Sequence, residues 1–509
     1  MYSKLITSML IGLDGYKIEV EADIARGMPS FNIVGLPDAS IKESKERVKS
    51  AISNSGYSFP LGRITINLAP AALKKEGSHL DLSIAMSILE ANGVTIRKIP
   101  EELIFIGELA LDGRLMPVEG VLPMIISMRD LGFKDFFIPI DNSKEASLVS
   151  DVNIYPAKTL IEIVQHINGE KLINKIESSF DINLKSPTYD VDYKDIKGQE
   201  SMKRAFEVAA AGGHNILVIG PPGSGKTMAA RRLPTILPDM TFEEAIECTK
   251  IYSVAGKLGT DGLIIHRPFR SPHHTASEAS LIGGGRIPKP GEVSLAHNGI
   301  LFLDELPEFS KSVLEVLRQP MEDGEVLISR VNGQSVYPSK FITVVCMNPC
   351  KCGYFGSQVR ECTCSTSQIN NYLSKISGPL LDRFDIHLEA NPVDIKNLQS
   401  GANERSSKDM KEAVSKARDL QAKRYKDDGI RVNDELSGSL LKKYIKISLE
   451  DEKILKMAYE KYNFSARSYN KILKLSRTIA DLDGENNIKT SHILEALRYR
   501  ALDDKYWRR

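Results

Sequence analysis

The sequence predicts an α/β protein whose central domain is built on a parallel sheet, with a mixed α+β domain before it and a helical region after it. Two short apolar runs, residues 216–219 and 299–303, lead directly into polar residues, as buried strands do when they end at a functional edge. After residue 392 the chain turns strongly charged and keeps a helical spacing of apolar side chains. These features divide the 509 residues into about three domains.

The first part of the chain mixes strand-like and helical patterns, which favours an α+β domain. Residues 31–34 and 63–68 are typical of strands, whereas residues 81–90 have helical periodicity. A polar stretch with few large apolar side chains follows and is predicted to be a linker. The predicted division is 1–168 for the α+β domain, 169–193 for the linker, 194–394 for the parallel-sheet core and 395–509 for the helical region.

The first apolar run leads into the sequence GPPGSGKT. This matches G-x-x-x-x-G-K-[ST], a loop whose backbone N–H groups face phosphate oxygens. In such a loop Lys226 reaches the terminal phosphates of a nucleotide, and the Thr227 hydroxyl binds Mg²⁺. A glycine-rich turn without a ligand is the alternative, but a second motif downstream argues against it. The predicted nucleotide-binding residues are Gly220, Pro221, Pro222, Gly223, Ser224, Gly225, Lys226 and Thr227.

The second motif is GILFLDE, a hydrophobic strand that ends in two carboxylates. An ordinary buried strand rarely ends in this way. Asp304 is suited to hold Mg²⁺ through water, and Glu305 is suited to polarise an attacking water. Together the two motifs predict that the core binds and hydrolyses ATP with the help of Mg²⁺.

The composition limits the classes of partner. Lys plus Arg number 67 and Asp plus Glu number 66, so a net charge of +1 draws the whole molecule neither to nucleic acid nor to an anionic membrane. Any nucleic-acid site must therefore be a local patch. The N-terminus has no cleavage-site pattern, and no segment approaches the ~18 apolar residues of a membrane span. We expect a cytoplasmic location and no membrane partner.

Four of the six cysteines fall within fifteen residues, as two C-x-C pairs. Four thiolates can close a tetrahedral structural zinc site, and glycines between the pairs would let the loop fold around the metal. The spacing departs from the commoner C-x₂-C, and reduced, metal-free cysteines in a surface loop are the alternative. The predicted zinc ligands are Cys350, Cys352, Cys362 and Cys364.

A strand–turn–strand unit is predicted over residues 326–345, because Asn332-Gly333 tolerates the positive φ of a tight hairpin turn. The apolar strand that closes this unit runs on to Asn348. An amide at the end of a strand is notable, because its side chain can both donate and accept hydrogen bonds.

Two arginines follow in recognisable contexts. GPLLDRFDIHLE places Arg383 beyond a helix, and SARSYNKIL places Arg467 at the start of another. With the preceding motifs, this ordered set resembles AAA+ ATPases of the magnesium-chelatase-like kind, and over nearly the whole chain it is similar to the bacterial YifB/ComM family. The resemblance implies an AAA+ P-loop ATPase core with an N-terminal Lon-protease-like domain and a C-terminal helical lid, assembled as a hexameric ring.

The resemblance also implies roles for three catalytic residues beside Lys226 and Glu305. Asn348 resembles the sensor that orients the lytic water. Arg383 is similar to the arginine finger, which enters the neighbouring subunit's site and stabilises charge in the transition state. Arg467 resembles the second sensor arginine, which reports nucleotide state to the helical lid. A surface ion pair is the alternative for each arginine.

The segment 267–290 has a local charge of +3, from four basic residues against Glu278. In the ATPases that the chain resembles, this segment is an insertion that faces the ring pore, together with the hairpin at Asn332-Gly333. We expect both to bind a DNA backbone by phosphate contacts, without sequence preference. A solvated loop that transmits nucleotide state is the alternative. The predicted DNA-contacting residues are Arg267, Arg270, Arg286 and Lys289.

Residues 74–85 and 106–121 resemble the proteolytic domain of Lon proteases. Lon-type catalysis needs a serine nucleophile activated by a neutral lysine. In an ungapped alignment, His79 stands where the serine should be, with Ser78 one position early, and Leu122 stands where the lysine should be. The dyad is therefore predicted to be absent, and the domain is expected to act as a scaffold or a DNA-contacting collar.

The resulting hypothesis is a homo-oligomeric ring ATPase that translocates on DNA. In this family that implies branch migration during recombination or natural transformation. Three alternatives differ in substrate: a magnesium-chelatase motor subunit, an ATP-dependent Lon-like peptidase and a σ54-type transcription activator. The last lacks its GAFTGA loop and a terminal helix-turn-helix here, and the chelatase subunit is not expected to carry a Lon-like domain.

Overall fold

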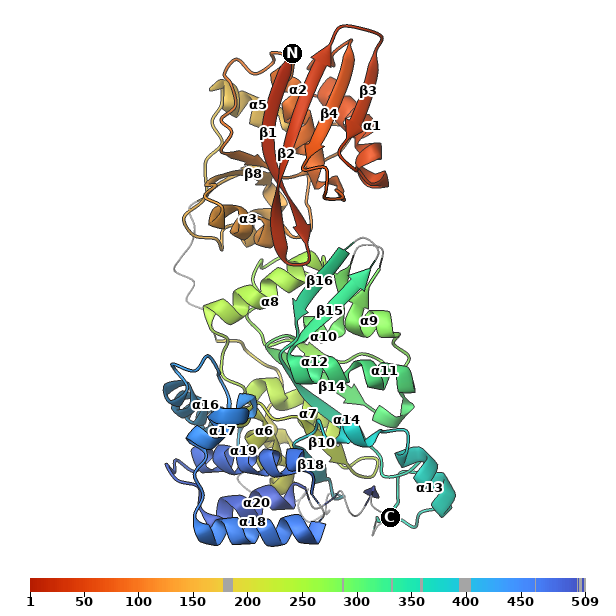
Figure 1. The fold of residues 1–509 in the computed structure, drawn as a ribbon, viewed down its shortest axis with the longest axis vertical. Helices are drawn as coiled ribbons and strands as arrows, with labels where there is room; N and C mark the ends of the chain where they lie inside the picture. Colours follow the sequence, from red (N-terminus) through yellow and green to blue (C-terminus); the bar gives the residue numbers. More distant parts are fainter. Residues whose placement is uncertain are drawn as a thin grey trace.

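The computed structural model of the protein describes residues 1–176, 186–285, 288–330, 333–357, 360–392, 404–462, 464–500, 502 and 506–507. Its three parts follow one another along the long axis of the molecule, with the N-terminal domain at one end and the C-terminal helices at the other (Figure 1). No helix among these residues is both long enough and apolar enough to cross a membrane.

The N-terminal domain is a mixed seven-stranded sheet in the order β3-β4-β2-β1-β5-β8-β9. Its strands are β1 (Tyr2–Ile11), β2 (Asp14–Ala25), β3 (Ser30–Val34), β4 (Arg63–Ala69), β5 (Leu103–Phe105), β8 (Asp135–Pro139) and β9 (Asn153–Ala157), and β6 (Glu108–Leu109) pairs with β7 (Leu115–Met116) beside it. Two apolar cores lie on opposite faces of this sheet.

The helices of this domain divide between the two faces of the sheet. One core receives α1 (Ala39–Asn54), α2 (Asp81–Ala91) and α5 (Leu160–Asn168), and the other receives α3 (Val121–Asp130) and α4 (Ser143–Ala146). The short η1 (Ser78–Leu80) precedes α2, and η2 (Ile140–Asn142) precedes α4. The strands and the helix predicted for this domain coincide with β3, β4 and α2.

The central domain is a parallel five-stranded sheet in the order β11-β14-β17-β10-β18. Successive side chains of each strand face opposite sides, so Ile216 and Val218 enter one core while Leu217 and Ile219 enter the other. Because all five strands are parallel, their carboxyl ends lie at one edge. The strands are β10 (Ile216–Ile219), β11 (Phe269–Arg270), β14 (Gly299–Asp304), β17 (Phe341–Met347) and β18 (Ile386–Glu389).

Helices cover both faces of this sheet. One core contains α6 (Glu200–Gly212), α7 (Lys226–Arg232), η4 (Leu233–Ile236) and the C-terminal helices, and the other contains α9 (Glu278–Ile282), α10 (Glu292–Leu295), η5 (Leu306–Glu308), α11 (Lys311–Val316), α13 (Thr366–Leu373) and α14 (Gly378–Leu381). The remaining elements are η3 (Tyr193–Asp195), α8 (Phe242–Val254) and α12 (Arg318–Asp323).

Two small hairpins project from the central domain toward the N-terminal one. They are β12 (Gly283–Gly284) with β13 (Lys289–Pro290), and β15 (Glu325–Arg330) with β16 (Gly333–Pro338). The prediction of a hairpin at Asn332-Gly333 is confirmed by the pairing of β15 with β16, although Asn332 itself lies outside the described residues. The predicted second strand was wrong in extent, because the chain leaves the hairpin at Pro338 and β17 joins the parallel sheet.

The C-terminal region is helical, as expected. Ser465 caps α19 by accepting the Ser468 N–H at 3.2 Å, and Gly484 follows the end of the helix with a φ of +70°. The helices are α16 (Ser407–Arg424), η6 (Asn433–Glu435), α17 (Gly438–Tyr444), α18 (Leu449–Tyr462), α19 (Ala466–Leu482) and α20 (Thr490–Arg498).

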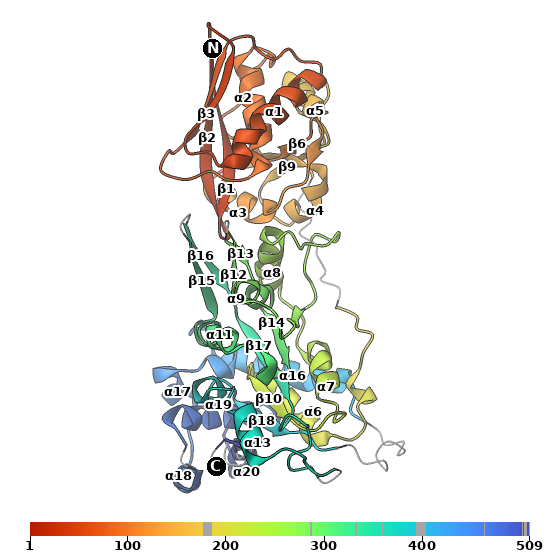
Figure 2. The ribbon, with the colours of Figure 1, turned by 90° about the vertical axis from the view of Figure 1, so that its right-hand side faces the viewer.

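The N-terminal and central domains contact each other directly. Figure 2 shows the end of the β1–β2 hairpin close to β12, β13, β15 and β16, and α3 close to α8. The Ser253 hydroxyl donates to the buried Glu145 carboxylate at 2.5 Å, and Lys289 Nζ lies 2.6 Å from the Glu119 carboxylate. The N-terminal domain therefore packs against α8 and the two small hairpins of the central domain.

Candidate nucleotide site

The phosphate-binding loop connects β10 to α7, so it lies at the carboxyl edge of the parallel sheet. Gly223 and Gly225 have φ values of +77° and +84°, a region that side chains other than glycine rarely adopt. A Cβ on Gly220 would lie 2.5 Å from the Ala390 carbonyl oxygen, so this position accepts only glycine. The helix α7 begins at Lys226, and its N-terminus supplies the positive end of the helix dipole to the loop.

Lys226 is buried between the loop and the end of β17. Its Nζ lies 2.7 Å from the Gly220 carbonyl oxygen and 3.4 Å from Asn348 Oδ1. Burial lowers the pKa of Lys226, and the Asp304 carboxylate opposes this shift. The structure thus brings the predicted lysine and the predicted sensor amide together.

The predicted Mg²⁺ ligands also meet. Thr227 Oγ1 donates to Asp304 Oδ2 at 3.0 Å, which joins the start of α7 to the end of β14. A hydroxyl and a carboxylate at the end of a phosphate loop are the oxygen ligands that Mg²⁺ prefers, so these residues fit the ion.

Glu305 adopts a left-handed backbone conformation, with a φ of +53°. Its N–H donates to the Asp304 carboxylate at 3.0 Å, and its side chain is exposed at the edge of the sheet. A non-glycine residue with positive φ is strained, and such strain is concentrated at functional sites. The turn thus leaves the second carboxylate exposed to solvent just beyond the end of β14.

Gln199 supports the loop from behind and was not predicted. Its backbone is left-handed, with a φ of +58°, and its side-chain amide donates to the Asn391 carbonyl at 2.6 Å. The same amide lies 3.5 Å from the Ser224 carbonyl oxygen of the loop. A polar residue just before α6 was the only sequence signal for this contact.

Arg383 lies at the opposite edge of the sheet from the phosphate loop. Its carbonyl accepts a hydrogen bond from the Asn215 side chain at 3.3 Å, at the amino end of β10. Because β10 and β18 run parallel with Ile216 beside Ile386, four residues of strand, roughly 13 Å, separate this end from the loop. A single chain therefore does not bring Arg383 to its own loop.

Arg467 shares the edge occupied by Arg383. Both guanidinium groups contact the carboxylate of Glu322 in α12, Arg383 through Nη2 and Arg467 through Nη2 at 2.9 Å. These three residues line a cleft of about 690 Å³ between the central domain and the C-terminal helices. Sequence reasoning missed Glu322 because it lies 61 residues from Arg383 and 145 from Arg467.

A buried arginine ties the two sides of this cleft together. Arg500 Nη1 donates to the Phe384 carbonyl at 2.7 Å, and Arg500 Nη2 donates to the Ser468 hydroxyl at 3.2 Å. Phe384 follows Arg383 in the chain, and Ser468 follows Arg467. One guanidinium thus holds the segments that carry both candidate arginines.

The predicted DNA-contacting arginines form ion pairs within the protein. Arg267 lies 2.9 Å from Glu244 and also donates to three backbone carbonyls. Arg270 binds Glu292 through two hydrogen bonds of 2.6 and 2.8 Å. The local charge of +3 is therefore offset by acids from outside the segment. Lys289 is half exposed beside Glu119 on the N-terminal domain.

Arg286 lies outside the described residues, so it takes no part in this comparison. The DNA contact of the whole segment stays a prediction.

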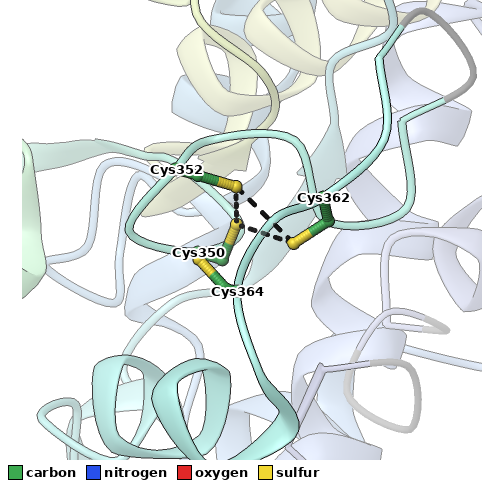
Figure 3. Close-up of side chains that lie close together, drawn as sticks. All are labelled: Cys350, Cys352, Cys362 and Cys364. Carbon is green, nitrogen blue, oxygen red and sulfur yellow. Dashed lines mark hydrogen bonds between the residues drawn. The ribbon is translucent and has the colours of Figure 1, made fainter.

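The four predicted zinc ligands converge after β17 (Figure 3). The Sγ–Sγ distances are 3.3 Å for Cys350–Cys352, 3.6 Å for Cys350–Cys362 and 3.5 Å for Cys352–Cys362. All four sulfurs, including that of Cys364, lie within 4.8 Å of one another. The cysteines are free thiols and form no disulfide.

The Lon-like positions of the N-terminal domain do not assemble a dyad. The Ser78 hydroxyl donates to Glu108, and the buried Lys75 amine donates to the Pro70 carbonyl. Leu122 is fully buried in the apolar core around α3. His79 has no hydrogen-bond partner for its buried Nε2 among the described residues, and burial lowers its pKa to about 4.

Comparison with known families covers all three parts of the chain. Residues 192–398 match the family described as "Magnesium chelatase, subunit ChlI", and residues 404–500 match "Magnesium chelatase, subunit ChlI C-terminal". Residues 20–142 match "Subunit ChlI of Mg-chelatase".

Several bacterial proteins are similar over nearly their full length. The competence protein ComM of Haemophilus influenzae is 43% identical, over 97% of this chain and 96% of its own. YifB of Escherichia coli is 40% identical, over 98% of this chain and 96% of its own. Lon protease 2 of Bacillus subtilis is 29% identical over a shorter stretch, 27% of this chain and 26% of its own.

Proposed function

The chain belongs to the magnesium-chelatase-like AAA+ ATPase family that includes ComM and YifB, and from this premise we propose that it is a ring-forming ATPase that moves DNA. The ring is expected to be a hexamer, and the movement is expected to be branch migration during recombination or natural transformation. The proposed cofactors are ATP with Mg²⁺ at the nucleotide site and Zn²⁺ as a structural ion at the four cysteines.

The observation that carries the ring is the separation of two half-sites on one chain. Lys226, Asp304 and Asn348 meet at the carboxyl edge of the sheet, whereas Arg383 and Arg467 lie together at the amino edge. A cation that stabilises the transition state must reach the γ-phosphate. A complete site therefore needs the carboxyl edge of one copy, which carries the phosphate loop, and the amino edge of the next copy, which carries Arg383 and Arg467.

Each residue then has a defined task in hydrolysis. Mg²⁺ bound at Thr227 and Asp304 would draw electron density from the phosphate oxygens. The Glu305 carboxylate accepts hydrogen bonds from the attacking water, and the Asn348 amide orients that water beside Lys226. The Arg383 guanidinium of the adjoining copy balances charge that develops as the γ-phosphate departs.

DNA is the proposed substrate of the movement. The support is the family relation to ComM, together with two hairpins and Lys289 that project from the same side of the central domain. Arg267 and Arg270 form ion pairs within the protein, so contact with DNA phosphates would depend on Lys289 and on neighbouring copies. A chelatase-type remodelling ATPase and a Lon-like peptidase remain the competing functions, and the unassembled dyad disfavours the second.

Mixing two inactive variants tests the shared site. Lys226→Ala and Arg383→Ala chains are each expected to lose ATP hydrolysis, and their mixture is expected to regain a fraction of it. Recovery arises because a ring can place an intact loop against an intact arginine. Absence of any recovery, with mixed rings present by size-exclusion chromatography, would contradict the shared site.

The DNA proposal is tested by ATP hydrolysis with branched, single-stranded and duplex DNA, at several salt concentrations. We expect stimulation by DNA that weakens as salt rises, because phosphate contacts release counterions. The Glu305→Gln variant should still bind ATP and DNA but not turn over. The chelatase-type function would be favoured if none of the DNA substrates changed the rate of ATP hydrolysis and if the protein did not bind DNA even at low salt.

A further inference from the structure

We infer that the four-cysteine cluster is a zinc site that braces the nucleotide pocket, so that the geometry of the phosphate loop depends on the bound metal. Figure 3 shows the side chains of Cys350, Cys352, Cys362 and Cys364 gathered from two stretches of one loop. This inference rests on the proposed ATPase function only in its activity measurement.

The sulfur positions fit a tetrahedral metal. With zinc–sulfur bonds of about 2.3 Å, the sulfurs of a tetrahedral site lie roughly 3.8 Å apart. The three Sγ–Sγ distances among Cys350, Cys352 and Cys362, 3.3 to 3.6 Å, are close to this value and far longer than a disulfide bond of about 2.05 Å. Four thiols this close repel one another once ionised, unless a cation lies between them.

Backbone N–H groups also point at the sulfurs. The Phe355 N–H donates to Cys350 Sγ at 3.3 Å, and the N–H groups of Tyr354 and Thr363 face Cys352. Such hydrogen bonds stabilise the thiolate form, which is the form that binds zinc. The loop therefore presents four soft ligands with an outer layer of donors.

The cluster touches the nucleotide site on two sides. Cys350 lies two residues beyond Asn348, so a metal bound there restrains the end of β17. Gly353 lies against the phosphate loop, because a Cβ at this position would be 2.7 Å from Pro222 Cδ and 3.9 Å from Asn348 Cγ. Cys364 precedes α13, whose Tyr372 hydroxyl faces the Asn348 backbone N–H.

A metal at the cluster would thus join the end of β17 to the start of α13, with the sensor amide and Pro222 between them. Without the metal, both C-x-C pairs are free to separate. A displacement of about 1 Å at Asn348 or the loop is enough to slow turnover on the order of a hundredfold.

The first test is the metal content of the purified full-length chain under reducing conditions. We expect about one zinc per chain, lost from a Cys362→Ser/Cys364→Ser variant and retained in a Cys248→Ser control. Cys248 is buried elsewhere and donates to the His297 carbonyl, a bond that serine can keep. Replacement with Co²⁺ should give the intense visible absorption of a tetrahedral thiolate site. A chain without zinc, or one that holds iron and sulfide instead, overturns the inference.

The second test removes zinc from the wild-type chain with a chelator that spares Mg²⁺, then restores it. We expect faster hydrogen exchange over residues 220–227 and 341–349 without zinc, and a fall in ATP turnover of roughly tenfold or more that zinc reverses. If hydrogen exchange over these residues is the same with and without zinc, the inference that zinc restrains the nucleotide pocket is overturned. If exchange changes but the zinc-loaded chain never hydrolyses ATP, the brace stands and the ATPase proposal fails.

Discussion

The central and N-terminal domains are both sheets covered by helices on two faces. Among the described residues, the predicted catalytic groups come together in the central domain but not in the N-terminal one. In the central domain, Asp304 and Asn348 end two neighbouring strands and meet the phosphate loop. In the N-terminal domain, the corresponding Lon-like positions hold the buried His79 and the core residue Leu122. A shared architecture therefore does not carry a shared chemistry.

The largest effect should come from Lys226→Ala, which removes the cation of the phosphate loop. We expect ATP binding to be lost in equilibrium titrations with a fluorescent nucleotide, because no other side chain takes the place of this buried amine. Lys411→Ala, which breaks an ion pair with Asp239 outside the loop, is the matched control. Retained ATP binding would move the nucleotide site away from this edge.

Arg383→Ala should slow hydrolysis by about 10³-fold while leaving ATP binding within a few-fold of wild type. The reason is that, in the proposed ring, Arg383 would act on the transition state at a neighbouring copy's site. Arg431→Ala is the control, because Arg431 lines the same cleft and pairs with Glu244 at 3.2 Å. Equal loss in both variants would mean that the cleft as a whole, and not Arg383, is responsible.

The N-terminal domain should lose stability as the pH falls, because of His79. Burial lowers its pKa to about 4 from an unfolded value of 6.5, so the stabilising neutral form is complete above pH 6.5 and is progressively opposed down to pH 4. The loss between pH 7 and pH 5 is about 2 kcal/mol. Hydrogen exchange over α2 measures it, and His79→Leu should remove that part of the pH dependence.

Glu322→Gln should have a small effect that separates two roles for this carboxylate. If Glu322 competes with phosphate for the arginines, the KM for ATP falls, by at most about fivefold, because exposed ion pairs are worth about 0–1 kcal/mol. A rise in KM with a lower kcat would instead mean that Glu322 positions them. Glu315→Gln, which breaks the nearby pair with Arg318, is the control.

Ser78→Ala should change neither ATP hydrolysis nor the response to DNA. Ser78 donates only to Glu108, and the structure brings no lysine to it among the described residues. The check is ATPase activity alongside digestion of an unfolded protein such as casein. Cleavage of casein by the wild type that disappears in Ser78→Ala would restore the peptidase function.

The nucleotide half-site could be predicted from the sequence because its parts lie at or just beyond the ends of their strands. Asp304 ends β14, and Lys226 follows β10 after the loop of residues 220–225, so each motif also fixes the place of its residue in the sheet. The arrangement of Arg383 and Arg467 at the amino edge could be predicted only in part. Their partner Glu322 comes from α12, which is distant from both arginines in sequence. For the same reason, the acids that pair with Arg267 and Arg270 escaped a charge count within one segment.

The start of β17 could also not be predicted from the local sequence pattern. Two apolar strands separated by Pro338 look continuous in sequence, and the break became apparent only from the pairing of Phe341–Met347 with β10 and β14. Turn chemistry predicts where a hairpin begins, whereas partner strands decide where it ends.

The Arg500 guanidinium holds the carbonyl of Phe384, next to Arg383, and the hydroxyl of Ser468, next to Arg467. A rotation of the C-terminal helices that displaces Ser468 would also displace Phe384. Arg383 and Arg467 would then move together toward the nucleotide site of the adjoining copy. In the proposed ring, one buried side chain would then couple the movement of the C-terminal helices to the timing of ATP hydrolysis.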